Sequence, residues 1–271
     1  MIKDITIGQF FPGKSFIHKM DARMKVCLTL VFIILVFLVK NFYSMALMLV
    51  ALGVIVGVSR VPIKIIAKGV KPILILIIFT AILNVFYVKK GQPLVDFYFI
   101  HITTGGLFTA LFMVIRIICL IVSSSMLTYT TSPTMLTDAL ERLMSPLKVL
   151  KIEVHSIAMM MTIALRFIPT LIDEIDRIMN AQKARGADME TGNLSQRVKA
   201  LIPIFIPLFV SSFRRAYELA FAMECRCYRG GDGRTRMKQM KLKGRDYLAL
   251  VIIVLVFAGV ILLNRFFVAV I

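Results

Sequence analysis

Five stretches of the 271-residue chain are rich in leucine, isoleucine, valine and phenylalanine and almost free of charge. Since about twenty apolar residues cross a bilayer as a helix, we interpret them as transmembrane helices. The predicted spans are 25–39, 43–58, 72–88, 107–130 and 247–267, of which the first two are short.

The region 132–245 has a different pattern, in which apolar stretches mix with dense charge. It begins with an amphipathic helix, for which Ser132 is a suitable N-cap and Pro133 a suitable first residue. Leu136, Leu140 and Leu143 then fall on one face of that helix. We divide the chain accordingly into an N-terminal segment (1–24), four spans (25–131), this middle region (132–245) and a last span (246–271).

Two long helical segments follow inside the middle region and share one plan. Each has an apolar beginning that contains proline, an amphipathic second half and an arginine at its tip. When the two arginines are aligned, Glu174 pairs with Arg215. Because Arg166 interrupts the first apolar beginning and two prolines interrupt the second, we expect both helices to lie along the cytoplasmic interface rather than to span the membrane.

The two tips are Ala184-Arg185-Gly186 and Cys225-Arg226-Cys227. Gly186 is a typical residue at a helix C-terminus, and Gly230-Gly231 follow the second arginine closely. One interpretation is that each cation only stabilises the negative end of its helix dipole, a common effect of about 0.3–1 kcal/mol. The other is that each arginine offers its planar guanidinium to a carboxylate in a partner's groove. Two similar tips favour docking onto a dimeric partner with one socket per subunit.

Composition excludes a soluble domain, because 59% of the residues are hydrophobic and the mean hydropathy is +0.85. Lys and Arg number 33 against 15 Asp and Glu, a net charge of +18. The basic residues border the apolar spans, so we expect the lipid bilayer as partner and no nucleic acid. They concentrate at 14–25 and 60–71, which places both stretches, and with them the N-terminus, in the cytoplasm.

One motif points to nucleotide binding and is rejected. "GQFFPGKS", residues 8–15, fits the P-loop expression G-x-x-x-x-G-K-S. A phosphate-binding loop directs backbone N–H groups at the phosphates and lies between a strand and a helix of an α/β sheet. Phe10, Phe11 and Pro12 fill this loop with bulk, and a membrane span follows it. We therefore expect any ATPase to reside in another chain.

Other candidates for chemistry are weak. Cys225 and Cys227 have no further ligand at a zinc-like spacing, and His18, His101 and His155 lie far apart. We expect no cofactor and no metal. The five spans contain no Asp or Glu, which argues against a stand-alone proton- or cation-coupled transporter. Arg116 lies inside the fourth span, either as a pathway residue or as a packing or snorkelling arginine, the interpretation we favour.

The sequence resembles the transmembrane T component of energy-coupling factor (ECF) transporters over nearly its full length. Four stretches carry the resemblance: "PGKSFIHKMDARMKV", "TTSPTMLTDALERLMSPLK", "RFIPTLIDEIDRIMNAQKARGAD" and "FRRAYELAFAMECRCYRGG". Met20 and Ala22 replace the family's usual leucine and proline, and Cys225 replaces the commoner alanine of the second tip. Cysteine is also small, so we expect the same docking.

The resemblance implies an all-α, multi-pass protein of a bacterial or archaeal cell membrane, with long cytoplasmic coupling helices. It implies a non-catalytic subunit whose arginine tips insert into two ABC-type ATPase subunits, which bind ATP and magnesium. The remaining cytoplasmic helices would hold a substrate-binding S component for vitamin or metal-ion uptake. Met159, Met160 and Met161 are candidates for that contact, since methionine surfaces repack against different partners. A stand-alone transporter or channel, and a membrane-bound nucleotide hydrolase, are the alternatives.

Overall fold

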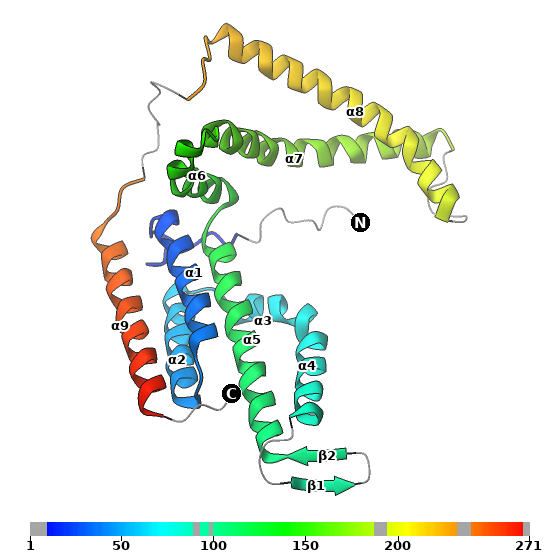
Figure 1. Ribbon diagram of the computed structural model, residues 1–271. Coiled ribbons are helices and arrows are strands. Elements are labelled where there is room, and N and C mark those ends of the chain that lie inside the picture. Colours follow the sequence, from blue (N-terminus) through cyan, green and yellow to red (C-terminus); the bar gives the residue numbers. More distant parts are fainter. Residues whose placement is uncertain (1–9, 89–92, 98–99, 187–193, 232–239, 268–271) are drawn as a thin grey trace. The chain divides into compact units, whose positions relative to one another are not determined.

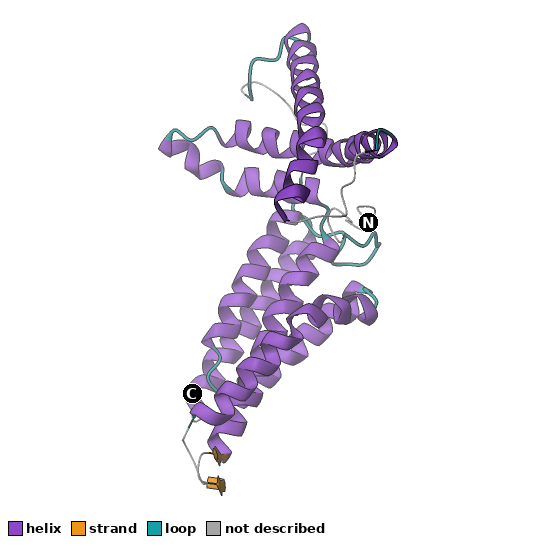
Figure 2. Cartoon of the chain, turned by 90° about the vertical axis from the view of Figure 1, so that its right-hand side faces the viewer, coloured by secondary structure: helices purple, strands orange, loops and turns teal. Residues whose placement is uncertain are grey.

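The computed structural model describes residues 10–88, 93–97, 100–186, 194–231 and 240–267 (Figure 1). Almost all of this part is helical, and one short hairpin supplies its strands (Figure 2). The chain divides into two compact units. The bundle unit comprises residues 8–139 and 238–271, and the two-helix unit comprises residues 140–237 with 1–7. Each is described by itself.

The bundle unit contains most of the elements, which follow in chain order. They are α1 (Ala22–Leu38), α2 (Phe42–Ser59), α3 (Ile63–Val70), η1 (Lys71–Ile73), α4 (Leu74–Tyr87), β1 (Pro93–Phe97), β2 (Ile100–Thr103), α5 (Thr104–Thr130) and α9 (Gly244–Phe266). Helix α6 (Pro133–Leu143) crosses from this unit to the other, which contains η2 (Ser145–Leu150), α7 (Val154–Ala184) and α8 (Leu194–Cys225).

Polar residues start the bundle helices by accepting hydrogen bonds from the first turn. Asp21 accepts from the backbone N–H of Arg23, Asn41 from that of Ser44, and Thr103 from that of Gly106. Each of these side chains satisfies a donor that has no partner inside its helix. Helix boundaries predicted from hydrophobicity alone were therefore off by a few residues, because the caps lie in the polar residues that flank each apolar stretch.

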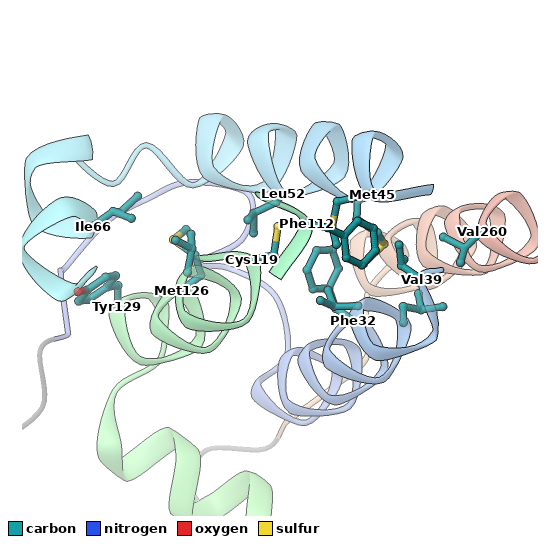
Figure 3. Close-up of a cluster of buried hydrophobic side chains, with 14 of the residues drawn as sticks. Phe32, Val39, Met45, Leu52, Ile66, Phe112, Cys119, Met126, Tyr129 and Val260 are labelled. Atoms are coloured by element: carbon teal, nitrogen blue, oxygen red, sulfur yellow. The ribbon is translucent and has the colours of Figure 1, made fainter. Parts of the chain in front are cut away.

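Helix α5 is the centre of the bundle, since it packs against α1, α2, α3 and α4, while α9 packs against α1 and α2. A continuous cluster of buried side chains fills the space between them (Figure 3). Phe112 and Cys119 of α5 are completely buried in it. The cluster consists of Phe32, Leu35, Val36, Val39, Met45, Met48, Leu52, Val61, Ile66, Phe112, Cys119, Val122, Met126, Tyr129 and Val260.

The outer surface of the bundle is apolar as well. Ile75 of α4 is 79% exposed and Val50 of α2 is 64% exposed, and many other large aliphatic side chains share this exposure. Such a surface is stable only against lipid or another apolar partner. The bundle is therefore a membrane-embedded structure.

Six segments of the described residues are long and apolar enough to cross a membrane, judged by length and composition. They are Phe42–Ser59, Ile63–Tyr87, Thr104–Thr130, Val154–Ala184, Lys199–Cys225 and Gly244–Phe266. Four of them overlap the predicted spans 43–58, 72–88, 107–130 and 247–267. The first predicted span corresponds to α1, which with 17 residues is shorter than these six. The other two segments contain α7 and the greater part of α8.

The basic stretch 60–71, which we expected to be a connection between two spans, contains a helix. Arg60 ends α2 with a left-handed backbone (φ 57°), and Pro62 then precedes α3. Lys64 and Lys68 are exposed on α3 while Ile66 is buried. Such a pattern of charged and buried positions is typical of a helix that lies along the membrane surface.

Helix α6 begins as predicted. The hydroxyl oxygen of Ser132 accepts from the N–H of Met135, and the Ser132 carbonyl accepts from the N–H of Leu136. Its leucine face is not its most buried face, however. Thr137 and Ala139 are 3% and 0% exposed, whereas Leu143 is 36% exposed.

In the two-helix unit, α7 and α8 pack against each other as an antiparallel hairpin. Near their connection, the Gln182 side chain donates to the carbonyl of Pro203. Further along, Arg215 forms an ion pair with Glu174 at 2.9 Å. The pairing suggested by aligning the two arginine motifs is therefore a real contact, although the alignment had matched the residues only as equivalent positions.

The prediction of an all-α, multi-pass membrane protein is confirmed. The antiparallel hairpin of β1 and β2, nine residues in its two strands, was not foreseen. It joins α4 to α5, where the close approach of the two helices leaves little room. A Cβ atom on Gly106 would lie 3.0 Å from the carbonyl oxygens of both Val85 and Val88.

Candidate coupling site at two helix ends

The first arginine tip ends α7 with a regular C-cap. Arg185 is the C-cap residue, and its N–H lies 3.3 Å and 3.1 Å from the carbonyl oxygens of Ala181 and Gln182. Gly186 follows with φ 84°, and its N–H donates to the carbonyl of Lys183 at 3.0 Å. Glycine adopts this left-handed conformation without a steric penalty, so the prediction that Gly186 ends the helix is confirmed.

The second tip has the same construction with a different residue. Arg226 follows the last residue of α8, and Cys227 takes the left-handed conformation with φ 53°. The N–H of Cys227 donates to the Glu224 carbonyl at 2.8 Å, and that of Tyr228 donates to the Met223 carbonyl at 3.0 Å. These two bonds form a Schellman motif.

Gly230 and Gly231, which follow the second arginine closely, do not supply this cap. Gly230 has a positive φ of 87°, but it lies beyond the helix end. Cysteine rarely adopts the left-handed conformation, so Cys227 could not be recognised from the sequence as the residue that ends the helix.

Both tips present their arginine to the outside of the unit. Ala184, Arg185, Gly186, Cys225, Arg226 and Cys227 are all exposed. Because α7 and α8 are antiparallel, the two arginines lie at opposite ends of the hairpin. With 31 and 32 residues at about 1.5 Å per residue, the helices are about 46 and about 48 Å long. Two equivalent cationic tips thus lie at opposite ends of one helical hairpin.

The segment after the second tip folds back onto the first turn of α7. The Tyr228 hydroxyl lies 3.3 Å from Nε2 of His155 and donates to Sδ of Met159 at 2.8 Å. On its other side, Nδ1 of His155 is 3.0 Å from Oε1 of Glu141 on α6. These linked hydrogen bonds were not predicted from the sequence, because the residues that form them lie far apart in it. His155 had been assigned no partner.

Met159, Met160 and Met161 do not share one environment. Met159 is partly buried beneath Tyr228, whereas Met160 and Met161 are 60% and 42% exposed. Only the last two are free to face a partner.

The part of "GQFFPGKS" that the structure describes, residues 10–15, forms a turn around His18. The imidazole Nε2 is 2.9 Å from the Phe11 carbonyl and Nδ1 is 2.7 Å from the Ser15 hydroxyl. A carbonyl can only accept, so Nε2 carries the hydrogen and Nδ1 accepts from Ser15. A Cβ on Gly13 would lie 2.8 Å from the His18 ring. Gly13 leaves room for the His18 ring and Ser15 donates a hydrogen bond to it, so in the structure these two residues of the motif position a histidine.

A buried polar network ties this turn to the bundle. The Lys25 ammonium, in a side chain almost without exposure, donates to the carbonyls of Thr130 and His18 at 2.8 Å and 3.3 Å. Asp246 at the start of α9 is 2% exposed and accepts from the N–H groups of Asp21 and Lys243. These hydrogen bonds therefore connect the start of α1, the end of α5 and the start of α9.

Arg116 is a packing residue. Its guanidinium donates to the carbonyl of Val39, at the end of α1, at 2.6 Å and lies over the Phe112 ring at 4.8 Å. It thereby satisfies a carbonyl that its own helix leaves unpaired. This supports the favoured interpretation over that of a pathway residue.

Within the described residues no three His, Cys, Asp or Glu side chains converge as a metal site. The His101 side chain lies outside the described part of the chain. The four cysteines are free thiols, two of them at the exposed second tip.

An apolar helical bundle, together with a unit of two long helices that end in exposed arginines, defines a polytopic all-α membrane protein. Comparison with known proteins agrees. The family described as "CbiQ: Cobalt transport protein" matches residues 13–238, and the chain belongs to this family.

Several curated relatives carry the name "Energy-coupling factor transporter transmembrane protein EcfT". The chain is 54% identical to that of Clostridium kluyveri over 250 residues, covering 92% of this chain and 93% of the relative. It is 50% identical to that of Ruminiclostridium cellulolyticum over 267 residues (98% and 100%) and 42% identical to that of Bacillus subtilis over 259 residues (95% and 97%). The resemblance to the ECF transmembrane component is confirmed.

Proposed function

We propose that this protein is the non-catalytic energy-coupling subunit of an ECF-type importer in a bacterial or archaeal cell membrane. In this proposal Arg185 and Arg226 each dock into one of two ABC-type ATPase subunits. The ATPases bind ATP and magnesium, and their closure moves the hairpin of α7 and α8. The motion tilts a separate substrate-binding S component, which carries a vitamin or metal ion across the membrane.

One observation carries the proposal: the two arginines occupy equivalent C-cap positions at opposite ends of one antiparallel hairpin. In both, the following residue is left-handed and exposed. A cation that only stabilised its own helix dipole would not require the same exposed tip twice. Two like tips fit a partner that presents two like sockets, as a dimer does.

An apolar face on α8 supports the second half of the proposal. Five aromatic residues repeat at every fourth position along it: Phe205, Phe209, Phe213, Tyr217 and Phe221, each more than 60% exposed. Residues four apart lie on one side of a helix. Large exposed apolar surfaces mark protein or membrane contacts. We assign this face, with Met160 and Met161, to the S component.

The test replaces each arginine by alanine, singly and together, with exposed Arg214→Ala on α8 as the matched control. Losing a charge-assisted contact costs roughly 2–5 kcal/mol of binding free energy. Each single variant keeps its other tip, whereas the double variant loses both anchors and with them the avidity of two-point attachment. We expect reduced co-purification of the ATPase subunits in the singles and loss in the double, with Arg214→Ala unchanged. A double variant that retains both ATPases would show that the arginines only cap their helices.

A further inference from the structure

The second arginine tip is held by α7 as well as by α8. From residue 216 to residue 226, all within the described part, no side chain is buried. This end of α8 therefore receives little support along its sides. The support comes from the segment that follows Arg226, which returns to the first turn of α7.

Two contacts fix that returning segment. Tyr228 reaches His155 and Met159 with its hydroxyl, as described above. Gly231 lies so close to the same histidine that a Cβ atom at this position would overlap the imidazole ring. His155 is in turn held by Glu141, whose side chain is 17% exposed against 32% for the histidine. The residues Glu141, His155, Tyr228 and Gly231 thus form one connected latch.

We propose that Tyr228 and His155 are positioning residues that couple the second arginine tip to the first turn of α7. A displacement of Arg226 is then transmitted directly to Val154–Met159, at the other end of α7 from Arg185. Both ends of α7 thereby respond to docking. This inference rests on the proposed function, since it assumes that a partner moves Arg226.

The experiment uses the chain purified with its ATPase subunits in lipid nanodiscs and measures hydrogen–deuterium exchange with and without AMP-PNP. Tyr228→Phe removes only the hydroxyl, and Tyr217→Phe makes the same change on the exposed face of α8. In the parent and in Tyr217→Phe, we expect AMP-PNP to change exchange at residues 154–159. In Tyr228→Phe that response is lost, and the amides of Cys227 and Tyr228 exchange roughly five- to tenfold faster, as expected for a locally opened helix end.

Two results separate the latch from the docking proposal. In Tyr228→Phe the ATPases should still co-purify, because Arg226 is intact, and His155→Ala should reproduce its exchange pattern. An unchanged AMP-PNP response at residues 154–159 in both variants would overturn the latch while leaving arginine docking intact. If the double variant Arg185→Ala/Arg226→Ala retained its ATPases but Tyr228→Phe still opened the helix end, the docking proposal would fail and so would transmission from a partner, while the Tyr228 contact itself would stand.

Discussion

At the scale of single residues, Cys227 ends a helix in a left-handed conformation that glycine usually adopts. A residue with φ near 53° at a helix end is usually glycine, as Gly186 is at the first tip. Cysteine has a Cβ atom and is strained there. The Schellman bonds to Glu224 and Met223 nevertheless form. The next residue, Tyr228, is held by the hydrogen bond from its hydroxyl to Met159. The contacts of the following segment therefore compensate for the missing glycine.

His18 makes the stability of the bundle depend on pH. Burial lowers the pKa of His18, the hydrogen bond to the Phe11 carbonyl opposes this shift, and the nearby Lys25 ammonium adds to it. The unfolded chain takes up a proton near the usual value of 6.5, whereas the folded chain resists protonation. The folded state therefore binds fewer protons, and stability falls as the pH drops through that value.

We expect the thermal midpoint of the purified protein to decrease from about pH 7.5 to about pH 5.5, a range that brackets the usual histidine pKa. His18→Gln removes the titrating group, so it should lower the midpoint at neutral pH but flatten this decrease. Differential scanning fluorimetry across the range measures both. If the thermal midpoints of parent and variant decreased in parallel with pH, His18 would be excluded as the cause of the decrease.

At the scale of elements, Asp246 joins α9 to the N-terminal turn. Its two carboxylate oxygens accept from the N–H groups of Asp21 and Lys243 at 2.9 Å and 2.8 Å. Asp246→Ala leaves the buried N–H of Asp21 and the partly buried N–H of Lys243 without this acceptor, which should cost roughly 2–4 kcal/mol of unfolding free energy. Asp246→Asn keeps one oxygen, so its unfolding free energy should lie between those of the parent and of Asp246→Ala. Exposed Asp173→Ala is the control, and equal thermal midpoints for the two alanine variants would refute the role.

The elements also show how far the sequence could predict the structure. Apolar stretches identified the cores of α1, α2, α4, α5 and α9, because lipid imposes long uniform segments on a helix, whereas the short basic helix α3 was not recognised. Ser132 and Gly186 were recognised because capping acts through neighbouring residues. Asp246 as a buried acceptor, and His155 as the partner of Tyr228, could not be recognised. Their contacts join residues 225 and 73 positions apart, and a local pattern carries no information on such distances.

The site was predictable to the same extent. The two arginines were found because each stands at the end of a long helical pattern. Only the backbone conformation shows that they are equivalent C-cap residues, because a cysteine at position 227 is not typical of a helix end. The latch needed the tertiary structure, because tyrosine, histidine and glycine are each unremarkable at their own positions in the sequence.

At the scale of the whole molecule, the number of membrane crossings decides whether α7 and α8 can dock cytoplasmic partners. By length and composition both qualify as spans. Their charges and prolines favour an interfacial position instead. If they crossed as a hairpin, their connection would lie outside the cell; if they lie along the interface, it stays in the cytoplasm with the N-terminus. If the N-terminus is cytoplasmic, as the basic stretches predict, the connection between α1 and α2 lies outside in either case.

Two single cysteines distinguish these topologies, introduced into a variant whose four native cysteines are replaced. Ser195, at the beginning of α8, and Lys40, between α1 and α2, are both exposed. With a membrane-impermeant maleimide, we expect Lys40→Cys to react in intact cells and Ser195→Cys to react only after the membrane is opened, because basic stretches keep the N-terminus and the middle region inside. Retained ATPase co-purification in the cysteine-free variant is the control. Labelling of Ser195→Cys in intact cells would mean that α7 crosses the bilayer, and its arginine tip would then lie on the wrong side to meet an ATP-hydrolysing partner.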